Sequence, residues 1–199
     1  ETGSVSTQNV AALAGESAST VAARVSAVEG VTATANTELT LTVTDAGSIP
    51  PTLRLNGIDL TSTASGPVPT PVDSDFLATR INTLFTGAGI IAQSDGTTLT
   101  VRSLTGEDLA LQNVSASGTD FITVNSINGE SLSTPIQLNT SFELTAAGTV
   151  TVTTDSNVSM SSSGGFLGGS SAQTLPAFAG YDIAISGQPQ AGDEFFVNT

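Results

Sequence analysis

Along residues 73–89 the apolar positions follow the period of a helix. They recur at i, i+4, i+7 and i+8 and so fall on one stripe: Leu77, Ile81, Leu84 and Phe85. Asp73, Ser74 and Asp75 precede this stripe and are candidates for the helix N-cap. Gly87 and Gly89 follow it and favour the left-handed backbone at which helices end. The sequence therefore predicts a short amphipathic helix.

A β-hairpin is predicted directly after this helix. Residues 90–94 and 97–102 are two short runs on either side of Asp95-Gly96, a dipeptide typical of hairpin turns. In the second run Leu99 and Val101 alternate with polar residues, so the two apolar side chains share one face of the strand. We expect that face to pack on the helix.

Residues 19–43 show the same order of patterns. The helical stripe consists of Val21, Val25 and Val28; a predicted hairpin turns at Asn36-Thr37, and Arg24-Val25 corresponds to Arg80-Ile81. We interpret this as an internal duplication of a helix–hairpin unit, with copies at about 17–44 and 53–102. The second copy includes a strand or tight hairpin at Leu53–Leu60, around Asn56-Gly57.

Beyond residue 103 the helical period disappears and short strands alternate with turns. The predicted strands are 109–114, 121–125, 136–138, 142–144, 150–152, 181–185 and 194–197. Asn128-Gly129 marks a turn, and Ala147-Gly148 is predicted to join the strands on either side of it as a hairpin. The expected fold class is α+β and mainly β, with antiparallel sheets and hairpins and two short helices in the repeated unit.

Two regions are expected along the chain. Residues 1–120 would hold both helix–hairpin units, and residues 121–199 would form a mainly β region that returns to the start of the chain; whether these are two subdomains is left open. Apolar residues near both ends have to be buried from water, so we expect the region around Val5–Val10 to neighbour Phe196–Thr199. Ends at opposite poles would instead suit a bead in a string of tandem domains.

The composition removes several function classes. The chain has 18 acidic residues, four arginines, no lysine and a net charge of −14, so it offers no cationic surface for nucleic acid or an anionic membrane. No apolar run approaches the length of about 20 residues that a membrane helix needs. The absence of cysteine excludes disulfides and thiol catalysis, and the absence of histidine removes the commonest general base.

The acidic residues near the second helix have two interpretations. Asp73, Ser74 and Asp75 offer hard oxygen ligands that suit calcium. They also suit a helix N-terminus, where carboxylates are favoured by the helix dipole. We favour capping over a calcium site.

The other candidate site residues favour structural roles. Asp193 is a ligand or, more plausibly, a turn residue, and Glu107-Asp108 would point to opposite faces of a strand and share no glycosidase site. Glu130 and Glu143 have no evident partner in the sequence. Tyr181 and the eight phenylalanines fit core packing better than a sugar-binding platform. We therefore expect no catalytic, cofactor-binding or metal-binding residues.

Two kinds of glycosylation signal are present. Asn113, Asn139 and Asn157 each begin an Asn-x-Ser sequon, which carries no meaning in most bacterial contexts. The serines and threonines of 159–174 are candidates for O-linked sugars, without any one being singled out.

Three segments, taken in order, resemble the outer domains of bacterial flagellins and hook-associated proteins. The first is GESASTVAARVSAVEGVTATA at 15–35, the second is LRLNGIDL at 53–60 followed by a helix with Ile81-Asn82, and the third is YDIAISGQPQAGDEFFV at 181–197. Together they cover about half of the chain. The long heptad-bearing helices through which flagellar axial proteins assemble are not in this sequence, so the resemblance is to the central, variable region alone.

The resemblance implies a structural, extracellular role on the bacterial flagellum. Its partners would be neighbouring flagellar subunits, with host antibodies or surface ligands as further candidates, and the isolated chain would be a monomer without enzymatic activity. Flagellin and hook–filament junction protein both remain open. The alternative is an extracellular adhesin-type module that recognises a glycan or a host protein. A hydrolase has little support, because no activating base is evident.

Overall fold

The computed structural model describes residues 7–13, 15–44, 52–113, 121–138, 142–155, 158–162, 181–185 and 194–198. They belong to two compact units. Unit 1 takes its residues from 1–36 and 147–199, and unit 2 consists of 37–146. Both units are built mainly from antiparallel strands and each has one α-helix, which confirms the predicted fold class. No helix among the described residues is long and apolar enough to cross a membrane.

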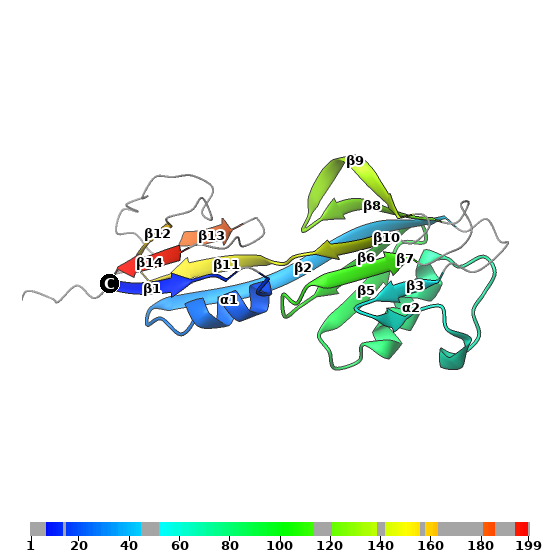
Figure 1. Cartoon of the computed structure of the whole chain (residues 1–199), viewed down its shortest axis with the longest axis horizontal. Coiled ribbons are helices and arrows are strands. Elements are labelled where there is room, and N and C mark those ends of the chain that lie inside the picture. The colour runs from blue at the N-terminus through cyan, green and yellow to red at the C-terminus, as the bar shows by residue number, and fades with distance from the viewer. Residues whose placement is uncertain are drawn as a thin grey trace, which may run out of the picture. The chain divides into compact units, whose positions relative to one another are not determined.

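Unit 1 combines the helix α1 with strands of two sheets (Figure 1). Its elements are β1 (Thr7–Ala11), α1 (Ala18–Val25), the first part of β2 (Val31–Thr44), β11 (Thr149–Thr154), β12 (Ser159–Ser162), β13 (Tyr181–Ile185) and β14 (Glu194–Asn198). One sheet has the order β1-β14-β12, and β11 lies between β13 and β2 in the other.

Among the described residues, the core of unit 1 consists of valines and alanines. Val21, Val25 and Val28 are at most 4% exposed, as the helical stripe predicted. They pack with the inward side chains of β11, Val150 and Val152, because alternate residues of that strand face α1. The small side chains suit a close approach of helix and sheet.

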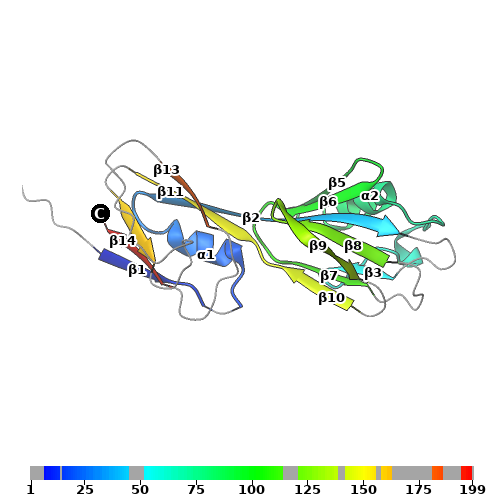
Figure 2. The ribbon, with the colours of Figure 1, turned by 90° about the horizontal axis from the view of Figure 1, so that it is seen from above.

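Unit 2 has two sheets and a helix. The elements are the second part of β2, β3 (Leu53–Leu55), β4 (Ile58–Asp59), a short 3-10 helix (Thr63–Ser65), α2 (Ser74–Leu84), β5 (Ile90–Ser94), β6 (Thr98–Ser103), β7 (Leu109–Asn113), β8 (Phe121–Ile127), β9 (Glu130–Leu138) and β10 (Phe142–Ala146). The strand orders are β9-β8-β2-β6-β5 and β10-β7-β3-β4. Figure 2 shows α2 beside β5 and β6.

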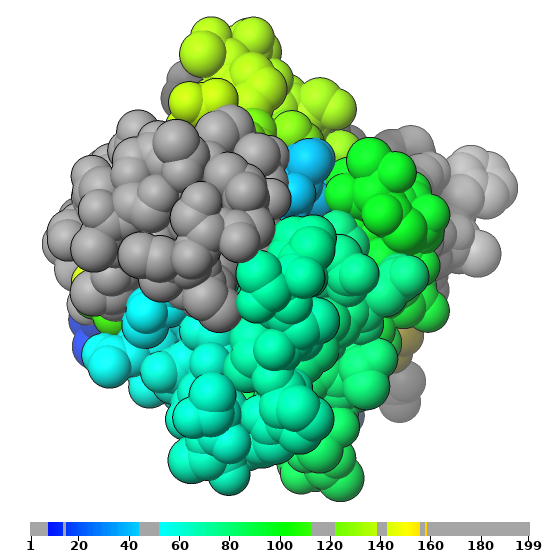
Figure 3. Space-filling model, turned by 90° about the vertical axis from the view of Figure 1, so that its right-hand side faces the viewer, coloured from blue at the N-terminus to red at the C-terminus, as the bar shows by residue number. Residues whose placement is uncertain are grey.

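The core of unit 2 lies between these two sheets and α2. One sheet contributes alternate residues such as Leu41 and Leu99, the other contributes Leu53 and Leu111, and all four are at most 1% exposed. Ile81 of α2 is 1% exposed and belongs to the same cluster. On the surface of this unit, the segment that runs from β3 to α2 forms a continuous area, cyan to teal in Figure 3.

Asparagine–glycine turns close two hairpins where the sequence predicted turns. Asn56-Gly57 joins β3 to β4 and Asn128-Gly129 joins β8 to β9, and all four residues have positive φ. Each asparagine side chain also bonds the neighbouring strand: Asn56 accepts from the Ala110 N–H at 2.7 Å, and Asn128 accepts from the Glu38 N–H at 2.9 Å. Each turn is therefore also hydrogen-bonded to a strand beside its own hairpin.

The predicted hairpin at Asn36-Thr37 is wrong. β2 is one continuous strand of 14 residues, in which Asn36 pairs with Thr149 and Thr37 pairs with Ser103. Neither residue is glycine, so a tight turn would place two side chains in the unfavourable left-handed region. The buried Thr37 hydroxyl instead donates to the Glu107 carbonyl at 2.8 Å.

The predicted hairpin at Ala147-Gly148 is also wrong. β10 pairs with β7, whereas β11 pairs with β2 and β13. Residues 147–148 instead carry the chain from unit 2 back to unit 1. The division predicted at residue 120 therefore differs from the division in the structure, because unit 1 is assembled from both ends of the sequence.

The two ends of the described chain are neighbours. β1 and β14 are antiparallel, with Thr7 opposite Asn198 and Val10 opposite Phe195. This confirms the expected proximity for the residues that the structure describes; Val5, Ser6 and Thr199 lie outside them.

Candidate functional site

The two helices carry polar side chains in equivalent roles at the same spacing. Ser17 caps α1 by accepting from the Thr20 N–H, and Asp73 caps α2 by accepting from the Phe76 N–H. An arginine follows each cap by seven residues: Arg24 on α1 and Arg80 on α2. Seven residues are about two helical turns, so each arginine lies on the same side of its helix as the cap.

Each arginine binds the segment that precedes its helix. Arg80 is 6% exposed and donates to the carbonyls of three consecutive residues, Ser65, Gly66 and Pro67. Arg24 donates to the Ala11 carbonyl and to the carboxylate of Glu16. The hydrogen bond from Arg24 lowers the pKa of Glu16, and the carboxylate in turn raises the pKa of Arg24.

Two residues after each arginine, a polar side chain makes two hydrogen bonds to the strand that follows the helix. The Asn82 amide donates to the Ala92 carbonyl and accepts from the Ala92 N–H, both at 2.8 Å. The Ser26 hydroxyl donates to the Ala33 carbonyl at 3.0 Å and accepts from the Ala33 N–H at 2.8 Å. The two copies thus share a helix N-cap, an arginine, a polar side chain that bonds the following strand, and that strand itself. The first copy has no hairpin.

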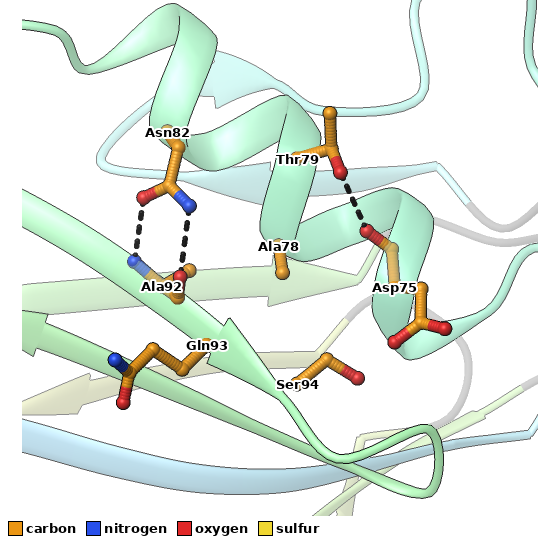
Figure 4. Close-up of a pocket in the computed structure, with 7 residues that line it drawn as sticks. All are labelled: Asp75, Ala78, Thr79, Asn82, Ala92, Gln93 and Ser94. Carbon is orange, nitrogen blue, oxygen red and sulfur yellow. Dashed lines mark hydrogen bonds between the residues drawn. The ribbon is translucent and has the colours of Figure 1, made fainter.

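A groove of about 480 Å³ lies between α2 and β5 (Figure 4). The helix contributes Asp75, Ala78, Thr79 and Asn82, which recur at i, i+3, i+4 and i+7 and so share one face. The strand contributes 92–94. In Figure 4 Asn82 reaches Ala92 at one end, while Asp75 and Ser94 lie toward the other.

The chemistry available in this groove is hydrogen bonding. The Thr79 hydroxyl donates to the Asp75 carbonyl at 3.0 Å, and the Asn82 amide is engaged with Ala92. Asp75 is the one ionisable residue among those that line the groove. A pair of carboxylates, which acid–base hydrolysis would use, is not among them.

The contacts of Asp73 support its interpretation as a helix cap, whereas Ser74 makes a different contact. The Asp73 carboxylate accepts from the Phe76 N–H at 2.7 Å, and the Ser74 hydroxyl donates to the Thr97 carbonyl at 3.1 Å. Both are therefore engaged within unit 2. In the described part of the chain, no three acidic side chains gather in a way that could hold a metal ion.

The carboxylate of Asp95 organises the turn between β5 and β6. It accepts from the N–H groups of Thr97 and Thr98 and from the Thr98 hydroxyl, at 2.7 to 2.9 Å. These bonds lower the pKa of Asp95 to about 2, chiefly through the backbone N–H of Thr98. The Asp-Gly-Thr-Thr sequence signals such a turn, and the role of the Asp95 carboxylate adds to the hairpin predicted there.

The remaining candidates lie on separate elements. Glu107 and Asp108 lie in the connection between β6 and β7 and not on a strand, and Glu130 and Glu143 are exposed on β9 and β10. Phe85 is 5% exposed and packs in the core, as predicted.

Several predicted residues lie outside what the structure describes. Asp193, Asn139, Asn157 and the serines and threonines of 163–174 are outside the described residues. Asn113 at the end of β7, Tyr181 at the start of β13 and residues 159–162 of β12 are placed by their backbone alone.

Comparison of the sequence with protein-family models and with curated proteins found no match. The function proposed below therefore depends on the chain's own residues and on the three resembling segments.

Proposed function

We propose that this chain is a structural outer module of a bacterial flagellar filament protein, either a flagellin or a hook–filament junction protein. Its role is to form part of the filament surface, where it sets charge and antigenicity and contacts neighbouring subunits. The single observation that carries the proposal is the antiparallel pairing of β1 with β14.

This pairing fits a module inserted into another chain. Because the two strands are antiparallel, the chain enters unit 1 at Thr7 and leaves at its Cα partner, Asn198. Opposed residues of antiparallel strands have Cα atoms about 5 Å apart. A helical core can therefore pass into the module and resume at nearly the same place, as an outer domain requires.

Charge and composition are consistent with an exposed position. A net charge of −14 on 199 residues gives a self-repelling surface. Three of the four arginines are engaged within the fold, Arg24 and Arg102 with carboxylates and Arg80 with carbonyls. The adhesin alternative fits less well, since domains in a tandem string need their ends at opposite poles.

The test is to replace the outer region of a flagellin with residues 7–198 of this chain. We expect filaments in electron micrographs that are decorated along their length by antibodies against the inserted chain. The matched control carries Val10→Asp, which places a carboxylate at a 4% exposed core position of β1 and should prevent display.

Two results would overturn the proposal. One is a folded insert that never enters filaments. The other is specific binding of the purified chain to a glycan on an array, which would favour the adhesin module. The purified chain by itself should neither polymerise nor hydrolyse ester, peptide or glycoside substrates.

A further inference from the structure

The outer edge of β5 is closed by a side chain. Among the described strands, β5 ends its sheet and pairs with β6 alone, and Ala92 lies opposite Val101 in that pair. Both backbone polar groups of Ala92 bond to Asn82, so they point away from β6. In an antiparallel pair such residues alternate, and the polar groups of Ser94 and Ile90 therefore face the same outer edge.

We propose that Asn82 and Ser26 are plugs that keep two sheet edges closed to strand addition by a second copy of this chain. A primary amide offers one donor and one acceptor, which is what a residue of an incoming strand would offer. With both bonds at 2.8 Å, Asn82 takes the place of that strand at Ala92.

Ser26 supports the same conclusion in unit 1. The first part of β2 pairs with β11 on one side, where Ala33 lies opposite Val152. On the other side of the strand, the backbone N–H and carbonyl of Ala33 both bond to the Ser26 hydroxyl. A hydroxyl and an amide differ in shape. Each nevertheless lies two residues after the arginine of its unit and bonds both backbone polar groups of one alanine.

The two plugged edges both lack the usual protection of an edge strand. Natural sheets protect edges with charges, prolines or very short strands. Neither β5 (IIAQS) nor residues 31–36 (VTATAN) has a charge or a proline. By contrast, the edge strand β9 has Glu130 and Pro135, β10 has Glu143, and β4 has two residues. The β1 edge gives its Ala11 carbonyl to Arg24.

A second copy is the occupant that fits the β5 edge best. Two identical edges can pair antiparallel about a two-fold axis, so every contact is made twice. The groove of about 480 Å³ beside residues 92–94 leaves space next to the edge. Thr79, Ser94 and the carboxylate of Asp75 line it, so an incoming strand would meet polar neighbours and a single charged one there.

The test compares Asn82→Ala with Thr83→Ala in the full chain. Thr83 is exposed and its hydroxyl bonds only within α2, to the Thr79 carbonyl at 2.9 Å, so this control removes a polar group without opening an edge. Analytical ultracentrifugation over a wide concentration range should show the parent and Thr83→Ala as monomers. Asn82→Ala should shift reversibly to twice the monomer mass as concentration rises.

Hydrogen exchange locates the contact. In the parent, the Ala92 amide should be protected although it lies on an edge strand. In dilute Asn82→Ala it should exchange roughly tenfold faster, the effect of losing one hydrogen bond. In the concentrated dimer the Ala92 amide should regain protection and the Ser94 amide should gain it.

A folded Asn82→Ala chain that stays monomeric at every concentration would overturn the proposal, as would association that leaves residues 90–94 unprotected. If circular dichroism shows that Asn82→Ala does not fold, Ser26→Ala decides the question by the same measurements at Ala33. A monomeric, folded Ser26→Ala chain would then refute the proposal.

Discussion

The guanidinium carbon of Arg80 lies 4.8 Å from the centre of the Phe76 ring. The two residues are four apart on α2, so both project from the same face of the helix. The ring covers one side of the cation while the carbonyls of 65–67 bind its edge. A buried cation thereby fastens the connection that precedes α2 to the helix.

Arg80→Ala should be strongly destabilising. It removes a side chain that is 6% exposed together with its hydrogen bonds to the carbonyls of 65–67, at a cost of about 3 kcal/mol. Arg80→Lys keeps the charge but loses the planar fork, so it should lower the free energy of unfolding by about 1–2 kcal/mol. Urea denaturation measures both, and Arg24→Ala is the comparison: Arg24 and Glu16 are 35% and 18% exposed, so the loss should be smaller. Equal losses at the two arginines would contradict this account.

Ile81→Asp should be among the most damaging single changes. Ile81 is 1% exposed, and an unpaired carboxylate there costs several kcal/mol, on the order of 4. Ile91→Asp makes the same chemical change on β5 at a position that is 37% exposed and should cost less than about 1 kcal/mol. Thermal denaturation of the two variants under the same conditions tests this difference in stability. A variant Ile81→Asp that melts like the parent would show that the helix does not pack on its sheet.

The Asp95 turn should contribute to stability in a definite pH window. Its folded pKa is about 2, below the ordinary value of 3.8, so the ionised carboxylate stabilises the folded chain. This contribution is fully present above pH 4 and is lost as the pH falls toward 2. Asp95→Asn should therefore be less stable than the parent at neutral pH, and the difference should shrink between pH 4 and 2. A difference that does not change with pH would rule out this role for the carboxylate.

The neighbouring ends can be tested with a disulfide. The chain has no cysteine, so Thr7→Cys with Asn198→Cys introduces a single possible pair. Opposed Cα atoms about 5 Å apart are within disulfide range, and oxidation should raise the melting temperature. In the control, Thr7→Cys is combined with Ser159→Cys. These residues flank Asn198 on opposite sides, nearly 10 Å apart by strand spacing, and should not crosslink. Crosslinking of the control alone would refute the β1-β14-β12 order.

Local chemistry explains which parts of the fold were predictable. The turns at Asp95-Gly96 and Asn128-Gly129 follow from the sequence, because Gly96, Asn128 and Gly129 have positive φ and these residue types tolerate that backbone. Asn36-Thr37 has no such preference, and its strand continues because Thr149 and Ser103 pair with it. Those partners are remote in sequence, so no local pattern identifies them.

The groove and its surroundings were predictable in part. The helix face and the cap at Asp73 follow from spacing and residue type. In the sequence Arg80 is the counterpart of Arg24 and Asn82 belongs to a resembling segment, and neither pattern predicts what these side chains contact. Their roles depend on where 65–67 and Ala92 pass in space, which only the tertiary structure determines.

The positions of the four arginines have a consequence for proteolysis. Trypsin cleaves after lysine or arginine, and this chain has no lysine. Each arginine lies in regular structure: Arg24 in α1, Arg54 in β3, Arg80 in α2 and Arg102 in β6. A protease needs several residues around the bond in extended, free backbone, so cleavage requires local opening of a helix or strand. In an environment rich in trypsin-like proteases, the rate at which these elements open will set the lifetime of the chain.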